Sequence, residues 1–163
     1  MAAMGPEDWA LAARWLSPSE RALFQRMQRP DQIHCARVAR WLLAEGEADE
    51  IIVRAALLHD VGKARYRLGV VHRTLYVLLA PLFRAFPPLF MGASGESHWW
   101  MPYYVIANHP RLGASMLAQA GCDERLWRLV ELHQQDPQLV GGIPDVQWTR
   151  DALAKLRRAD SHN

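Results

Sequence analysis

The sequence predicts an all-α protein, a single bundle of seven or more helices. Apolar residues recur at helical intervals in segment after segment, and no stretch alternates apolar and polar residues convincingly, as a half-buried strand would. Half of the 163 residues are hydrophobic and 22% are charged, as in ordinary globular proteins. This length suits one domain with a single core, so we expect one domain over residues 1–163, without internal repeats.

Capping residues and first-turn acids mark the helix starts in the first half of the chain. Acids open a predicted helix over residues 7–16, and Ser17 begins another, with a proline in its first turn. Asp31 is the expected N-cap of a third helix, which stops at Gly46. Asp49 begins the fourth.

The fourth helix runs into the sequence Ala-Ala-Leu-Leu-His-Asp-Val-Gly-Lys at residues 55–63. The apolar residues of this segment are expected to be buried in the core. The end of the helix then places an imidazole and a carboxylate, His59 and Asp60, side by side. Gly62 is expected to turn the chain out of the helix, and Lys63 leaves a cation beside the pair. His and Asp together suit a divalent metal, and a nearby Lys suits a phosphate oxygen. The alternative is a helix that simply ends in a polar pair.

Shorter helices are expected in the second half. One covers residues 103–108 and another residues 111–120, with a break at the intervening His-Pro pair. Asp123 caps the next helix, residues 135–144 form a loop with glycine and proline turn signals, and Thr149 caps the last helix.

The two cysteines and the start of the chain bear on its location. Cys35 and Cys122 have no paired spacing, so we expect neither a disulfide-linked partner nor a zinc knuckle. The first residues lack the basic region and apolar stretch of a signal peptide. A cytoplasmic location is therefore expected.

Other potential metal ligands stand in order around the His-Asp pair. His34 precedes the pair by one helix and a turn; His109 lies in His-Pro-Arg-Leu-Gly, His133 in Glu-Leu-His-Gln, and Asp160 near the end. His34 taken alone also fits a core-edge histidine bonded to a backbone carbonyl. The whole order, H…HD…H…H…D over roughly residues 30–160, resembles the HD superfamily of metal-dependent phosphohydrolases.

Two short motifs sharpen this resemblance. The sequence His-Asp-Val-Gly-Lys is similar to the superfamily signature HD-x-G-K, and residues 109–113 are similar to the H-P-x-x-G segment of its HD-GYP branch. The branch usually has two adjacent histidines where this chain has Leu132-His133, and often a Glu where it has Pro30. Both departures argue against a third metal. The Gly-Tyr-Pro tripeptide is missing, which argues against cyclic di-GMP as the substrate.

The resemblance implies one or two divalent metal ions. The first would be held by two imidazoles and two carboxylates: His34, His59, Asp60 and Asp160. Asp60 would bridge to a second metal, completed by His109 and His133. Metal pairs of this type lie about 3.5–4 Å apart and activate a water for attack on phosphorus. Asp60 and Lys63 are the expected catalytic residues, with Lys63 holding a phosphate oxygen. The mixed ligands suit Mn, Fe, Co, Ni or Zn.

An apolar and basic insertion, residues 65–105, separates the His-Asp pair from His109. Residues 61–122 hold six Lys or Arg against one acid, which suits an anionic ligand or a solvated basic face. The longest uncharged run is about ten residues, whereas a membrane-spanning helix needs about twenty. We expect residues 69–91 to form a kinked helical cap over the metals; the alternative is an extra core helix.

The function favoured by the sequence is that of a phosphohydrolase cleaving a phosphomonoester or phosphodiester of a nucleotide-like, small phosphorylated substrate. One alternative is a non-catalytic, regulatory module that binds metal or a nucleotide. Another is a peripheral membrane protein that uses the basic, apolar passage at residues 65–91.

Overall fold

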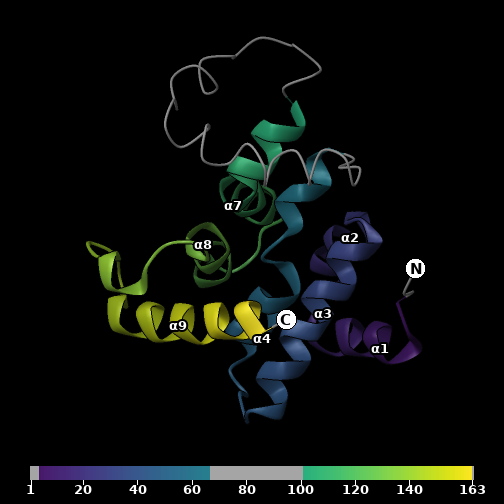
Figure 1. Cartoon of the computed structure of the whole chain (residues 1–163), viewed down its shortest axis with the longest axis horizontal. Coiled ribbons are helices and arrows are strands. Elements are labelled where there is room, and N and C mark those ends of the chain that lie inside the picture. The colour runs from purple at the N-terminus through teal and green to yellow at the C-terminus, as the bar shows by residue number, and fades with distance from the viewer. Residues whose placement is uncertain (1–3, 67–100, 163) are drawn as a thin grey trace.

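The computed structural model describes residues 4–66 and 101–162, which are drawn as coloured ribbon in Figure 1. Within these ranges the chain forms seven α-helices and two short 3₁₀ helices, and it has no strand there. The predicted all-α class is confirmed. The single-domain extent stays a prediction, and the expected cap at residues 69–91 falls outside the described residues.

Four helices form the first described range. They are α1 (Pro6–Trp15), α2 (Pro18–Arg26), α3 (Arg29–Ala44) and α4 (Glu50–Leu58). Ser17 caps α2 as predicted, because its hydroxyl accepts the N–H of Glu20 while the Glu20 carboxylate accepts the N–H of Ser17. The prediction for Asp31 is wrong. Helix α3 already begins at Arg29, since Pro30 fits a first helical turn, and Asp31 lies within that turn.

Three helices form the second range, namely α7 (Met101–Gln119), α8 (Glu124–Leu132) and α9 (Val146–His162). The 3₁₀ helices η1 (Val61–Arg65) and η2 (Pro137–Leu139) follow α4 and α8. Asp123 caps α8 as expected, by accepting the N–H of Arg125 at 2.8 Å. Thr149 does not cap α9. Its N–H already donates to the carbonyl of Asp145, so the helix has begun before it.

The break expected between residues 108 and 111 is absent. Helix α7 continues through Pro110, although proline lacks the N–H that would bond the carbonyl of Ile106. The imidazole of His109 takes that place, with its Nδ1 2.7 Å from the Ile106 oxygen. The backbone carbonyl therefore keeps a partner, and the helix tolerates the proline.

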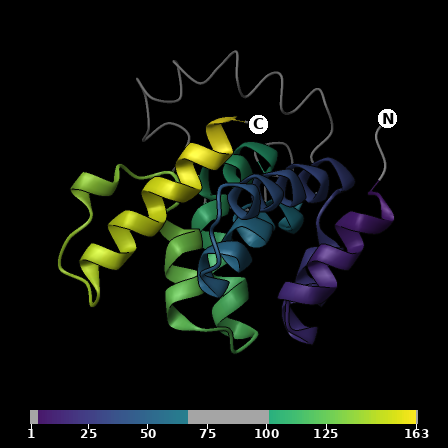
Figure 2. The ribbon, with the colours of Figure 1, turned by 90° about the horizontal axis from the view of Figure 1, so that it is seen from below.

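Helix α4 is the centre of the bundle (Figure 1). Its residues Ala55, Ala56, Leu57 and Leu58 are fully buried, and the helix contacts α1, α2, α3, α8 and α9. Helix α9 crosses the bundle with its C-terminal end near α3 (Figure 2). Helices from both ends of the chain thus meet around the end of α4.

A buried ion pair links α2 to this centre. The Glu20 carboxylate has no exposed surface and is bonded by the guanidinium of Arg54, including an Nε–Oε2 contact of 3.1 Å. Burial would raise the pKa of Glu20, but the hydrogen bonds from Arg54 and Ser17 hold it below its ordinary value. Glu20 is therefore ionised and paired inside the fold, where loss of either partner would leave a buried charge.

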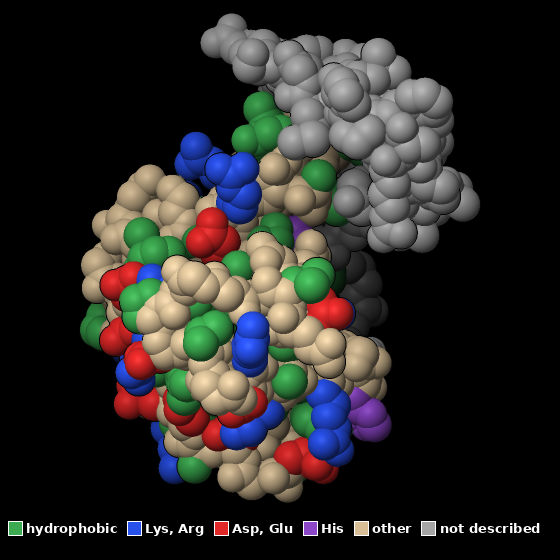
Figure 3. Space-filling view, turned by 90° about the vertical axis from the view of Figure 1, so that its left-hand side faces the viewer, with side chains coloured by type: hydrophobic (Ala, Val, Ile, Leu, Met, Phe, Trp, Pro, Cys, Tyr) green, Lys and Arg blue, Asp and Glu red, His purple; other side chains and the backbone are tan. Residues whose placement is uncertain are grey.

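The surface shown in Figure 3 carries acidic and basic side chains mixed over its lower part. In the described portion of the chain, no helix is both long enough and apolar enough to cross a bilayer.

The η1 segment lies directly against the backbone of α7, and two glycines permit this contact. A Cβ on Gly62 would lie 2.0 Å from the His109 oxygen and 2.7 Å from the Gly113 nitrogen. The predicted reason for Gly62 was wrong, because Gly62 is not among the positive-φ glycines. Absence of a side chain, rather than a special backbone conformation, is what the position requires.

Replacing Gly62 by Ala should therefore destabilise the fold by about 2–4 kcal/mol, because backbone atoms rather than flexible side chains block the added methyl group. Gly141→Ala is the matched control, since nothing lies within 4 Å of a Cβ there. Urea unfolding of both variants measures the difference. Equal midpoints for the two variants would contradict the close packing of η1 on α7.

Candidate metal centre

The structure brings all six predicted metal ligands together at the end of α4. They form two groups, and within each group one ligand atom per residue lies within 4.8 Å of the others. The first group is His34, His59 and Asp160, and the second is Asp60, His109 and His133. Residues that are up to 126 positions apart in the sequence thus share one site.

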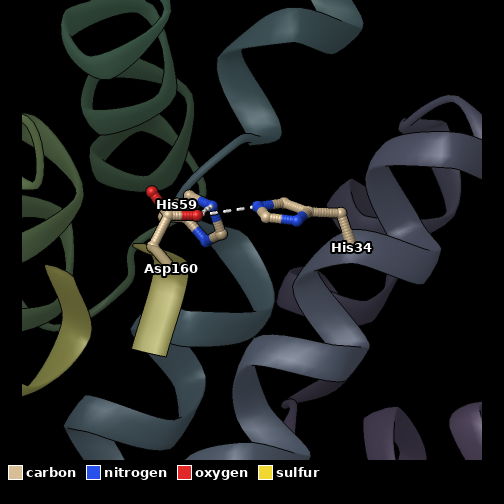
Figure 4. A group of neighbouring side chains, drawn as sticks. All are labelled: His34, His59 and Asp160. Carbon is tan, nitrogen blue, oxygen red and sulfur yellow. Dashed lines mark hydrogen bonds and ion pairs between the residues drawn. The ribbon is translucent and has the colours of Figure 1, made fainter. Parts of the chain in front are cut away.

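The first group lies on the more exposed side of the site. His34 reaches from α3 toward Asp160 at the end of α9, with His59 beside them (Figure 4). The Asp160 Oδ1 atom is 2.8 Å from His34 Nε2 and 3.6 Å from His59 Nε2. The side chains of His34 and Asp160 are 33% and 41% exposed, so solutes can reach this group.

The second group is buried between α7, α8 and the end of α4. His109 Nε2 lies 3.3 Å from Asp60 Oδ1 and 3.3 Å from His133 Nε2. All three residues are at most 5% exposed. Each of them therefore needs a partner inside the protein or a bound ion.

Three of the histidines have the same backbone contact. His59, His109 and His133 each place Nδ1 close to the carbonyl oxygen three residues earlier, at 2.9, 2.7 and 2.7 Å. A carbonyl only accepts, so Nδ1 carries the hydrogen and donates it. In a neutral ring, Nε2 then presents a lone pair, which is the form that binds a metal.

Local structure supplies the free carbonyls. His59 and His133 each follow the last residue of a helix, α4 and α8, where the final carbonyls have no helical partner. Ile106 has a free carbonyl because Pro110, four residues later, has no N–H.

The buried group fits a metal on these grounds. With both Nδ1 atoms donating to the backbone, Asp60 Oδ1, His109 Nε2 and His133 Nε2 face one another as three acceptors, with the contacts to His109 at 3.3 Å. Lone pairs at this separation repel unless a cation lies among them, either a proton or a metal ion. Two imidazoles and a carboxylate are suitable ligands for Mn, Fe, Co, Ni or Zn.

The electrostatics of the site favour ligand forms. Burial lowers the pKa of His59, and burial together with the neighbouring His59 lowers the pKa of His133 to about 3. Burial would raise the pKa of Asp60, but His59, His109 and Lys63 hold it well below its ordinary value. The imidazoles of His59 and His133 are therefore neutral and the Asp60 carboxylate is ionised, as metal binding requires.

His34 differs from the other three histidines. The hydrogen bond with Asp160 raises the pKa of His34, with burial opposing, and within residues 4–66 and 101–162 its Nδ1 contacts no backbone carbonyl. Its Nε2 therefore donates to Asp160, and this hydrogen must leave before His34 can bind a metal.

Lys63 lies beside Asp60, as the sequence predicted. Its Nζ is 2.6 Å from Asp60 Oδ2, and its side chain is 22% exposed. In this geometry Lys63 neutralises and orients the carboxylate, and its side chain is partly exposed.

Two neighbours of the site were not predicted. Gln134 places its amide nitrogen 3.3 Å from His109 Nε2, where it can donate to the lone pair. The fully buried Cys35 places Sγ 3.7 Å from Nδ1 of His59. That nitrogen already donates to Ala56, so Cys35 packs against the ligand rather than completing it. Its position directly after His133 was the available signal for Gln134. Cys35 directly follows His34 in the sequence, and its side chain is fully buried.

Among the described residues, the other candidates lie away from the site. His162 contacts Trp41, with ring centroids 5.3 Å apart, and His98 falls outside the described residues. A cavity of about 400 Å³ on the outer side of α7 and α8 is lined by none of the six predicted ligands.

Comparison with known proteins gives one finding. The family model described as HD domain matches residues 32–147, more than half of the chain. The match contains every predicted ligand except Asp160. Neither a search of curated proteins nor a search of solved structures finds a match.

The grouping of ligands predicts the metal content of a variant. Removing His133 takes a ligand from the buried group only, so His133→Ala should retain about one metal per chain after reconstitution with Mn or Zn and gel filtration. His162→Ala, a histidine outside the site, is the control and should bind as wild type does. Elemental analysis measures both. Two metals in His133→Ala would show that His133 is not a ligand.

Proposed function

The chain belongs to the HD-domain superfamily of metal-dependent phosphohydrolases, and we propose that it hydrolyses a phosphomonoester or phosphodiester of a nucleotide-like compound. One observation carries the proposal: three buried acceptor atoms, from Asp60, His109 and His133, face one another and call for a cation. The accessible group beside them gives a phosphate a place to meet that cation.

The ligands divide between two ions. His34, His59 and Asp160 would hold one, with Asp60 beside them, and His109 and His133 would complete the other. Bound metal ions supply an activated water and neutralise charge on the phosphate oxygens.

Asp60 is suited to serve both groups because its two oxygens face different residues. Oδ1 lies 3.3 Å from His109 Nε2, whereas Oδ2 lies 3.8 Å from His59 Nε2. Lys63 contacts Oδ2 at 2.6 Å and fixes the orientation of the carboxylate. The ammonium group of this partly exposed side chain can also bind a phosphate oxygen.

The exposure of the ligand residues determines the side from which a phosphate can approach the site. The buried group is closed off by protein, while His34, Asp160 and Lys63 all reach solvent. A phosphate therefore enters on the side of His34 and Asp160, with the rest of the substrate outside.

The test begins with purified protein, Mn and a generic aryl phosphate, followed by nucleotides, cyclic dinucleotides and sugar phosphates. Asp60→Ala should abolish hydrolysis and lower the metal content, because both groups lose a ligand, while circular dichroism stays helical. Asp151→Ala, an exposed carboxylate on α9, is the control. Wild-type turnover and metal content in Asp60→Ala would contradict the shared ligand. Metal binding without turnover of any substrate would favour a regulatory module instead.

Lys63→Ala separates phosphate binding from metal binding. We expect the metal content to persist while kcat/KM falls by roughly thirty- to a thousandfold, because about 2–4 kcal/mol of transition-state stabilisation is lost. Lys155, an exposed lysine on α9, gives the control variant Lys155→Ala. Loss of metal from Lys63→Ala would show that the lysine only orients Asp60.

A further inference from the structure

We propose that Pro110 is a positioning residue, which fixes the metal-binding tautomer of His109 by leaving the Ile106 carbonyl without a backbone partner. The inference deepens the proposed function, since it concerns a ligand of the same site. It can nevertheless be tested on the protein without metal.

The hydrogen-bond pattern of α7 is interrupted at Pro110. In an α-helix the N–H of each residue donates to the carbonyl four positions earlier. Pro110 has no N–H, so the carbonyl of Ile106 loses that partner in the interior of the helix. Nδ1 of His109 lies 2.7 Å from the same oxygen and donates to it.

The other two buried histidines obtain their backbone acceptors in a different way. His59 and His133 use the free carbonyls that any helix end provides. His109 lies well inside a helix of 19 residues, where the carbonyls are ordinarily occupied. Pro110 thus produces, in mid-helix, the acceptor that the other two sites obtain from a terminus.

The bond from Nδ1 determines which atom of the His109 ring keeps a free lone pair. With Nδ1–H held by Ile106, the lone pair of Nε2 points toward Asp60 Oδ1 and His133 Nε2, each 3.3 Å away. If the hydrogen moved to Nε2, it would donate to Asp60 and occupy the ligand position. The backbone bond therefore keeps His109 in the tautomer that can bind a metal.

Pro110 is also buried, so its ring could matter through packing alone. Two variants separate the explanations. Pro110→Ala restores the N–H, which then competes with His109 for the Ile106 carbonyl. Replacement of Pro110 by lactic acid, the ester analogue of alanine, removes the ring and also lacks the N–H.

The primary readout is the ¹⁵N chemical shift of the His109 ring in metal-free protein, recorded in alkaline buffer. We expect the Nδ1–H tautomer in wild type and in the ester variant, and a mixture with the Nε2–H tautomer in Pro110→Ala. The second readout is Zn affinity, which should fall about ten- to a hundredfold in Pro110→Ala and stay near wild type in the ester variant.

Pro102→Ala is the matched control. Pro102 is buried in the first turn of the same helix, where no carbonyl of α7 lies four residues earlier, so neither readout should change. An unchanged tautomer in Pro110→Ala would overturn the proposal, and so would an ester variant that behaves like Pro110→Ala. Failure of wild type to bind metal would contradict the proposed function instead, and the tautomer comparison would still stand.

Discussion

The site depends on one repeated interaction, the hydrogen bond from a histidine Nδ1 to the carbonyl three residues before it. It occurs at His59, His109 and His133, at 2.7–2.9 Å. Each bond satisfies a backbone oxygen that the helix itself leaves free, and each turns Nε2 toward the centre of the bundle. At His59 and His133, the end of the helix and the orientation of the ligand are therefore linked. Moving the end of α4 or α8 by a residue would change the acceptor and the direction of the ring together.

Close backbone packing places these rings within reach of the carboxylate. Asp60 immediately precedes η1. The η1 segment reaches α7 because Gly62 and Gly113 have no side chains. The backbone atoms of His109 and Gly113 leave no room for a Cβ on Gly62. This contact sets the 3.3 Å separation between Asp60 Oδ1 and His109 Nε2. The glycine in the His-Asp-Val-Gly-Lys segment thus acts on the site from a distance, by controlling how near two helices come.

The two ligand groups differ in how they would receive an ion. In the buried group the His133 imidazole is neutral and the Asp60 carboxylate is ionised, kept so by burial and by neighbouring charges. In the exposed group, His34 Nε2 is hydrogen-bonded to Asp160 Oδ1. An ion that binds the exposed group must displace the hydrogen that His34 donates to Asp160. The ligand atoms of the buried group instead present lone pairs that repel one another. Asp60 contacts both groups, so the occupancy of one affects the charge felt by the other.

Much of the architecture was predictable because its signals are local. Ser17, Asp49 and Asp123 cap helices as their side chains suggest, and the helical spacing of apolar residues gave the all-α class. The errors at Asp31 and Thr149 arose where another residue, two or three positions earlier, started the helix. Pro110 shows a different limit. A proline predicts a break because a backbone bond is lost, but a preceding histidine can replace that bond with its own side chain. The His-Pro pair therefore continues a helix and orients a ligand at once, an outcome that neither residue predicts alone.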